Sequence, residues 1–134
     1  MRSSGLPWTV LRLGAALPMR ITNLKAMFDV PLDTRIEFVD PRDAARAFAR
    51  GVGESSAIDR TLLIGGGKRC QFIYGEMVRR ILEAAGVGVL PADAYTSDPF
   101  YTDWLDTRPS QALLQYQRHD LEDYARAMRR KLGL

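Results

Sequence analysis

Residues 35–45 read Arg35-Ile-Glu-Phe-Val-Asp-Pro-Arg-Asp-Ala-Ala45, and this stretch joins a strand to a helix. The apolar and β-branched residues of its first half are typical of a short strand at 35–39. Asp40 then supplies a helix N-cap, and Pro41 suits the first helical position. Asp43 adds a carboxylate to the first turn. We therefore predict a helix over 41–50, closed by the glycines at 51 and 53. Its expected core-facing residues are Ala44, Ala45, Phe48 and Val52.

The same alternation continues on both sides of this junction. The residues at 8–13 and 60–64 are typical of strands, the first of them buried. Helical spacing recurs at 74–85, 107–115 and 120–132. A short helix is also expected before Pro31, from Ile21, Leu24, Met27 and Phe28. Strands that alternate with helices predict an α/β fold of about three short strands and four or five helices.

Length and composition limit the class of protein. The 134 residues are expected to form a single domain, 1–134, and 46% hydrophobic with 26% charged residues is ordinary for a globular chain. The net charge is +3. The densest basic cluster, at 126–131, falls at the end of a predicted helix, where cations complement the helix dipole. Without a recognised motif, this charge does not predict nucleic-acid binding.

The N-terminal apolar run does not resemble a membrane span. Arg12 interrupts the run at 6–17, and a central charge costs about 2.5–3.5 kcal/mol on insertion scales. No apolar stretch reaches the roughly 20 residues of a spanning helix. We therefore expect a cytoplasmic protein with no membrane partner.

The glycine run Gly65-Gly66-Gly67 does not fit either phosphate-binding motif. A phosphate loop needs glycine at position 62 and Ser or Thr after Lys68, whereas the chain has Leu62 and Arg69. The dinucleotide fingerprint needs a third glycine at position 70, which is Cys70. A tight turn after a strand is the favoured interpretation.

Candidate catalytic groups are few. Cys70 and His119 are the only residues of their types, so neither a disulfide framework nor a structural zinc site is expected. They could form a nucleophile and base, but a lone cysteine is more often an inert buried thiol. Four aspartates at 93, 98, 103 and 106 could supply an acid and a base, although helix capping and solvated surface explain them more simply.

Five segments in this order resemble the C-terminal part of the extended short-chain dehydrogenase/reductase family, the NAD-dependent epimerase/dehydratase group. They are Ser4-Gly-Leu-Pro-Trp-Thr-Val-Leu-Arg-Leu13, Ile36-Glu-Phe-Val-Asp-Pro-Arg-Asp-Ala-Ala45, Leu62-Leu-Ile-Gly-Gly-Gly67, Tyr74-Gly-Glu-Met77, and the closing stretch from Asp106 to Asp123. Leu13 stands where the family usually has proline, and Ile73 replaces the usual Ser or Thr cap. The resemblance covers nearly the whole chain.

The resemblance implies a substrate-binding role without catalysis by this chain alone. The family's glycine-rich loop and its Tyr-x-x-x-Lys pair are not found in these 134 residues. The resemblance therefore implies the C-terminal portion of a Rossmann-type epimerase, as a cloned fragment or a truncated gene product. It implies NAD or NADP for an intact protein and no cofactor for this chain by itself. The residues expected near the nicotinamide are Gly14, Ala15 and Ala16, and those expected to shape a pocket for a small-molecule substrate are Phe100, Tyr101 and Trp104.

A second hypothesis is a stand-alone interaction or assembly module that kept the fold. The strand at 8–13 has the apolar pattern of a buried parallel strand. Separated from a larger sheet, it would expose an unpaired edge that invites another chain. We therefore predict a homodimer or higher oligomer through this strand or its neighbouring helices.

Overall fold

The computed structural model describes residues 3–19 and 24–134 and shows an α/β fold, as predicted. The strands are β1 (Thr9–Leu13), β2 (Arg35–Glu37), β3 (Arg60–Ile64) and β4 (Gln71–Ile73). The helices are α1 (Leu24–Met27), α2 (Pro41–Gly53), α3 (Tyr74–Ala84), α4 (Arg108–Leu114) and α5 (Leu121–Leu132). Short 3₁₀ turns lie at Ser55–Ala57, Lys68–Cys70 and Ala92–Ala94.

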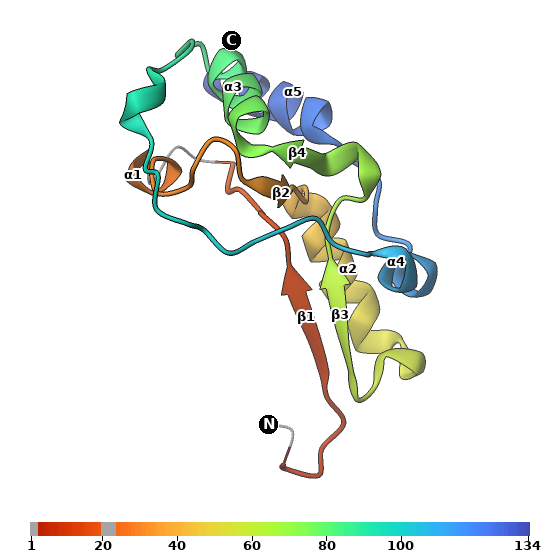
Figure 1. Cartoon of the computed structure of the whole chain (residues 1–134). Helices are drawn as coiled ribbons and strands as arrows, with labels where there is room; N and C mark the ends of the chain where they lie inside the picture. The colour runs from red at the N-terminus through yellow and green to blue at the C-terminus, as the bar shows by residue number, and fades with distance from the viewer. Residues whose placement is uncertain (1–2, 20–23) are drawn as a thin grey trace.

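The strands form two small sheets, which lie one above the other in Figure 1. β1 pairs with β3 in parallel, from Thr9 opposite Arg60 to Leu13 opposite Ile64. β2 pairs with β4 antiparallel. A parallel bridge between Ala15 and Phe38 joins the chain beyond β1 to the end of β2. The carboxyl end of β1 therefore points toward the second sheet.

Two hydrophobic cores follow from this arrangement. The upper core packs α3 and α5 against β2 and β4, and the lower core packs α2 and α4 against β1 and β3. Phe38 and Val39 are both fully buried, yet Phe38 belongs to the upper core and Val39 to the lower core. Successive side chains of an extended backbone point in opposite directions, so one short segment supplies both cores.

Two strand predictions need correction. β4 was not expected, because three residues directly after a glycine-rich turn carry too little periodicity to reveal a strand. The strand at 8–13 was expected to be fully buried, but Thr9, Val10 and Leu11 are only partly buried, and Arg12 and Leu13 are exposed. Among the described residues β1 has a strand on one side only, so its other edge is open.

Helix α2 begins as predicted but buries a different face. The Asp40 carboxylate accepts a hydrogen bond from the Arg42 amide at 2.8 Å, which confirms the N-cap. The expected core residues Phe48 and Val52 are 51% and 91% exposed, and Ala45 is exposed too. The buried residues are Asp43, Ala44 and Ala47. Asp43 faces inward because its carboxylate accepts the backbone N–H groups of Arg118 and His119.

The remaining helices agree with the predicted ranges within a few residues. Asp120 and Asp123 form a reciprocal capping box at the start of α5. Thr107 occupies the N-cap of α4 but makes no side-chain cap. The expected helix before Pro31 is present as α1, while Ile21 lies outside the described residues. Among the described helices, none combines the length and the apolar character needed to cross a bilayer.

Candidate functional site

A cavity of about 570 Å³ opens where β1 ends. Leu13, Gly14 and Ala15 line it from the carboxyl end of β1, and Phe100 and Tyr101 line it from the long loop before α4. Four of the six residues predicted from the sequence, Gly14, Ala15, Phe100 and Tyr101, thus meet at one cavity. Figure 1 shows this loop passing close to the ends of β1 and β3.

Gly14 is required by the close approach of two backbones at this point. Its amide donates to the Ile64 carbonyl at 2.8 Å, and the Ala15 amide donates to the Glu37 carbonyl at 2.8 Å. A Cβ on Gly14 would lie 2.6 Å from that same Glu37 oxygen, which real side chains do not tolerate. The cavity wall at this point is therefore bare backbone, and both amides are committed to the fold.

The inner wall of the cavity comes from the upper core. Met77, Val78 and Ile81 of α3 line it, together with Tyr124 and Met128 of α5. The Tyr124 hydroxyl donates to the Pro18 carbonyl at 3.0 Å. Burial raises the pKa of this tyrosine, so the phenol stays protonated as a donor.

Glu37 anchors the loop that carries the aromatic residues. Its side chain is buried, and Oε1 accepts the Leu105 amide at 3.0 Å and the Gln71 side-chain amide at 2.9 Å. The second oxygen, Oε2, accepts the Gly67 amide at 3.3 Å. The carboxylate thereby connects β2, β4, the glycine run and the loop. Glu37 was not predicted as a site residue, although an acidic side chain within an apolar strand indicates a buried partner.

Ala16 and Trp104 lie outside the cavity lining, unlike the other predicted site residues. Ala16 packs against the lower core. The Trp104 indole donates from Nε1 to the Phe72 carbonyl at 3.0 Å, and the Arg35 guanidinium lies 4.0 Å from the ring centroid. Trp104 therefore anchors the loop to the sheet formed by β2 and β4. The roles assigned to all six residues stay predictions.

The glycine run packs closely against other protein atoms. A Cβ at Gly65 would overlap the Glu37 carboxylate, and one at Gly66 would overlap the Cys70 side chain. Gly67 adopts a φ of 84°, a left-handed conformation that glycine takes without strain. The run follows β3 and leads into the turn at 68–70, as the turn interpretation expects.

Cys70 and His119 are close in space but do not form a nucleophile and base. The Cys70 sulfur lies 3.9 Å from the His119 carbonyl oxygen, whereas the imidazole Nδ1 lies 2.6 Å from Asp43 Oδ1. Burial raises the pKa of the Cys70 thiol to about 12. The thiolate, which is the nucleophile, is therefore not available near neutral pH.

Two of the four loop aspartates, Asp103 and Asp106, pair with arginines. Asp103 accepts Arg35 Nε at 2.9 Å, and Asp106 accepts Arg108 Nη2 at 2.9 Å. Hydrogen bonds from Arg108 lower the pKa of Asp106 to about 2. Within the part of the chain that the structure describes, no group of three or more His, Cys, Asp or Glu side chains could hold a metal ion.

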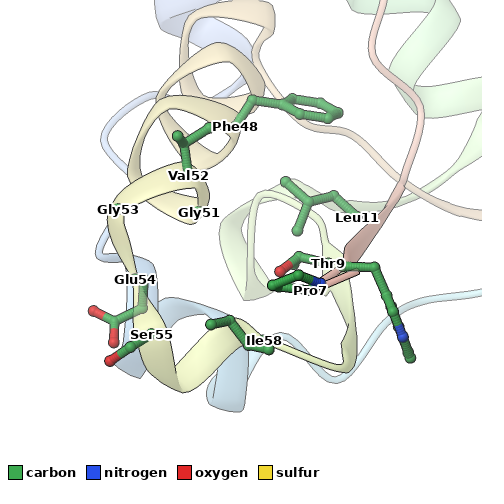
Figure 2. A pocket seen from close by; sticks show the side chains of 11 residues that line it. Pro7, Thr9, Leu11, Phe48, Gly51, Val52, Gly53, Glu54, Ser55 and Ile58 are labelled. Carbon is green, nitrogen blue, oxygen red and sulfur yellow. The ribbon is translucent and has the colours of Figure 1, made fainter. Parts of the chain in front are cut away.

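A second hollow, of about 480 Å³, lies between the start of β1 and the end of α2. We call it the α2 groove, and its apolar lining includes Pro7, Trp8, Leu11, Phe48, Val52 and Ile58. Figure 2 shows the side chains of Leu11 and Phe48 extending into the space between β1 and α2. Two of the residues wrongly expected in the core therefore line a surface groove.

The chain matches known proteins in structure but not in sequence. No family model matches the chain, and no curated protein matches it in sequence. A mutant UDP-glucuronic acid 4-epimerase from Bacillus cereus, bound to UDP-4-deoxy-4-fluoro-glucuronic acid and NAD, matches with a TM-score of 0.70 and 15% identity. The same enzyme bound to UDP-glucuronic acid and NAD matches with a TM-score of 0.69 and 15% identity.

The fold resembles about half of a UDP-glucuronic acid 4-epimerase. In each case the match covers 98% of this chain and 47% of the epimerase chain. The α/β fold expected from the family resemblance is thus confirmed, and the likeness at this identity concerns the fold alone.

Proposed function

We propose that this chain is the substrate-binding portion of an NAD(P)-dependent oxidoreductase of the epimerase/dehydratase type and is not catalytic by itself. The observation that carries the proposal is the cavity at the carboxyl end of the parallel pair β1–β3. In open α/β sheets, ligands bind in the crevice outside the carboxyl ends of the strands. The matching epimerase structures contain NAD together with a UDP-sugar.

The residues at the cavity mouth suit the nicotinamide end of a dinucleotide but not its pyrophosphate. Gly14 and Ala15 present bare backbone and a methyl group, which suit the flat face of a nicotinamide ring. Their amides are already bonded within the fold, and no cationic side chain is among the described residues that line the cavity. A pyrophosphate would find neither a glycine-rich helix start nor a counter-charge among these residues. When bound, the nicotinamide would supply hydride transfer, while Phe100 and Tyr101 would contact the substrate.

Nuclear magnetic resonance on the ¹⁵N-labelled chain tests this proposal. Titration with a panel of small alcohols, ketones and sugar nucleotides should move the amides of Gly14, Ala15, Phe100 and Tyr101 together. Calorimetry with NAD or NADP alone should show no saturable binding. Micromolar binding of either dinucleotide would contradict the non-catalytic role. Ligand shifts confined to Phe48 and Val52 would place the site in the α2 groove instead.

A second candidate function, an assembly module, is favoured by the open edge of β1. The Gly14 amide and the Trp8 carbonyl point toward β3. Because backbone groups alternate in direction along a strand, Thr9, Leu11 and Leu13 direct theirs toward the other edge. Beside this edge lie the α2 groove and the exposed side chains of Phe48 and Val52. Unpaired strand edges next to apolar surface promote association.

We propose that a second copy covers this edge in the isolated chain. Antiparallel pairing of two β1 strands about a twofold axis would give the order β3-β1-β1-β3, with both α2 helices on one face. Burial of about 400 Å² of apolar surface per chain would contribute on the order of 10 kcal/mol before the cost of association. In a longer protein that carries a nucleotide-binding part, that part would take the place of the second copy.

Sedimentation of two lysine variants tests the assembly. Val52→Lys should weaken the dimer at least tenfold without loss of stability, because Val52 is 91% exposed and a cation suits a helix C-terminus. Val89→Lys is the matched control, since Val89 is 73% exposed and lies in the loop after α3, outside the α2 groove. A monomeric wild-type chain at high micromolar concentration would refute the proposal, as would equal dimerisation of both variants.

A further inference from the structure

The cavity at the end of β1 is lined mainly by apolar residues, among those that the structure describes. Its inner surface consists mainly of aliphatic and thioether side chains from α1, α3, α5 and the segments around them. Representative members are Leu17, Met27, Ile36, Met77, Ile81 and Met128. The described residues that line it include no Asp, Glu, Lys, Arg or His. Unbranched methionines adapt to varied apolar shapes, so three of them favour an apolar occupant over a rigidly defined one.

The two tyrosine hydroxyl groups on the inner wall of the cavity are already hydrogen-bonded to backbone carbonyls. The Tyr74 hydroxyl donates to the Met27 carbonyl at 2.8 Å, and the Tyr124 hydroxyl donates to the Pro18 carbonyl at 3.0 Å. Among the described lining residues, the remaining polar side chains are Tyr101 and Thr102, both on the exposed loop at the mouth. A ligand that enters deeply would therefore bury its own polar groups without partners, which is costly.

This lining disagrees with the chemistry of the ligands bound to the structural relatives. Those epimerase structures hold UDP-sugars, which carry two phosphates and several hydroxyl groups. Charged groups are buried only when they are paired. The described residues that line the cavity offer no cation for the phosphates, and Tyr101 and Thr102 at the mouth are the polar side chains that remain for the hydroxyls.

We propose that the cavity binds an uncharged molecule with an aliphatic body and one polar end. The aliphatic body lies against the wall formed by α3 and α5, and the polar end lies at the mouth beside Tyr101 and Thr102. The volume of about 570 Å³ is in the range of small-molecule sites. The inference rests on the proposed function, because it names the substrate class of that same cavity. It also places the polar end of the ligand next to Gly14 and Ala15.

The mouth of the cavity provides a local reporter of occupancy. Phe100 is 48% exposed and Tyr101 is 95% exposed, although both line the cavity. An aliphatic ligand would cover part of these rings and remove them from water. Substitution at either position should weaken binding with little effect on folding, because neither side chain belongs to a core cluster.

Fluorescence with the uncharged dye N-phenyl-1-naphthylamine tests the proposal on the full chain. The dye should bind saturably, and 1-octanol and 1-decanol should displace it. Each methylene buried raises affinity about fourfold, the equivalent of about 0.8 kcal/mol, so decanol should compete about 16-fold better than octanol. UDP-glucuronic acid should not displace the dye at millimolar concentration. Displacement by the sugar nucleotide at lower concentration than by decanol would overturn the proposal.

A matched pair of variants separates the cavity from other apolar surface. Phe100→Ser should weaken dye and decanol binding at least fivefold. Phe48→Ser should leave both unchanged, because Phe48 is similarly exposed, at 51%, but lines the α2 groove. Equal effects of the two variants would overturn the proposal in favour of non-specific adsorption.

The outcomes also distinguish this inference from the function on which it rests. Sugar nucleotides that shift the Gly14 and Phe100 amides, with no effect of alkanols, would retain the substrate-binding role and refute the aliphatic class. If no ligand moves these amides, both proposals fail.

Discussion

Replacement of the buried carboxylate of Glu37 by an amide should destabilise the protein and release the aromatic loop. The carboxylate accepts N–H groups from Gln71, Leu105 and Gly67. In Glu37→Gln, one acceptor oxygen can still serve Gln71 and Leu105. The new NH₂ group then faces the Gly67 amide, donor against donor. Glu37→Ala removes all three acceptors and should cost more.

The magnitude follows from the charges and distances. Hydrogen bonds to a charged group contribute about 1.5–3 kcal/mol, against about 0.5–1.5 kcal/mol for neutral pairs, so each retained bond weakens by about 1 kcal/mol. The bond that is lost is long, at 3.3 Å, and an amide is cheaper to bury than a carboxylate. We therefore expect a loss of about 2 kcal/mol in the free energy of unfolding for Glu37→Gln.

Thermal and chemical denaturation measure this loss, and hydrogen exchange locates it. With about 2.1 cal/mol/K of unfolding entropy per residue, 2 kcal/mol corresponds to a fall of about 7 °C in Tm. The Leu105 amide should also exchange faster. Glu122→Gln is the control, because the Glu122 side chain is 63% exposed and its ion pair with Arg80 spans 3.6 Å. A Glu37→Gln protein as stable as the control would refute the anchoring role.

Three further predictions concern buried residues of the two cores and of the segments that join them. Gly66→Ala should destabilise by about 2 kcal/mol or more in urea titration, because the new Cβ would meet the Cys70 side chain and the Phe38 carbonyl. Asp43→Asn should cost about 1.5–3 kcal/mol by the same assay, because an amide cannot accept from the backbone of Arg118 and His119 and from the imidazole at once. Burial raises the pKa values of Cys70 and Tyr74 to about 12, so the folded protein retains protons that the unfolded chain loses above about pH 9 to 10. The free energy of unfolding should therefore fall as the pH rises from 9 to 12. Cys70 should also resist alkylation at pH 8 until the chain unfolds. A flat stability profile from pH 9 to 12, or rapid labelling of native Cys70, would contradict the last prediction.

Local chemistry made much of the fold predictable. Asp40 and Pro41 mark the start of α2, and Asp120 marks the start of α5, because capping needs only neighbouring residues. The buried face of α2 was not predictable in the same way. Asp43 is drawn inward by backbone amides some 75 positions further along the chain, a partnership that no local pattern reveals. The apolar side chains of Phe48 and Val52 consequently face outward.

The candidate site was also predictable only in part. Gly14 and Ala15 were named from the family resemblance, and they line the cavity. Phe100, Tyr101 and Trp104 were named together as one aromatic loop. Phe100 and Tyr101 line the cavity, but a hydrogen bond to Phe72 holds Trp104 elsewhere. The apolar inner wall belongs to helix faces that read as ordinary core in the sequence. Only the three-dimensional arrangement leaves a space between them.

Phe38 belongs to the upper core and Val39 to the lower core, and this division affects the local unfolding that hydrogen exchange detects. Because one short segment supplies two separate cores, the two halves share few apolar contacts apart from this junction. Amide protons are therefore expected to fall into two exchange classes, one for α3 and α5 and one for α2, β1 and β3, with the junction in the slower class. The cavity is lined mainly by the upper core, and Leu13 at the end of β1 is its contact with the other unit. A ligand that contacts Leu13 would link the two units, and the difference between the two exchange classes should then decrease.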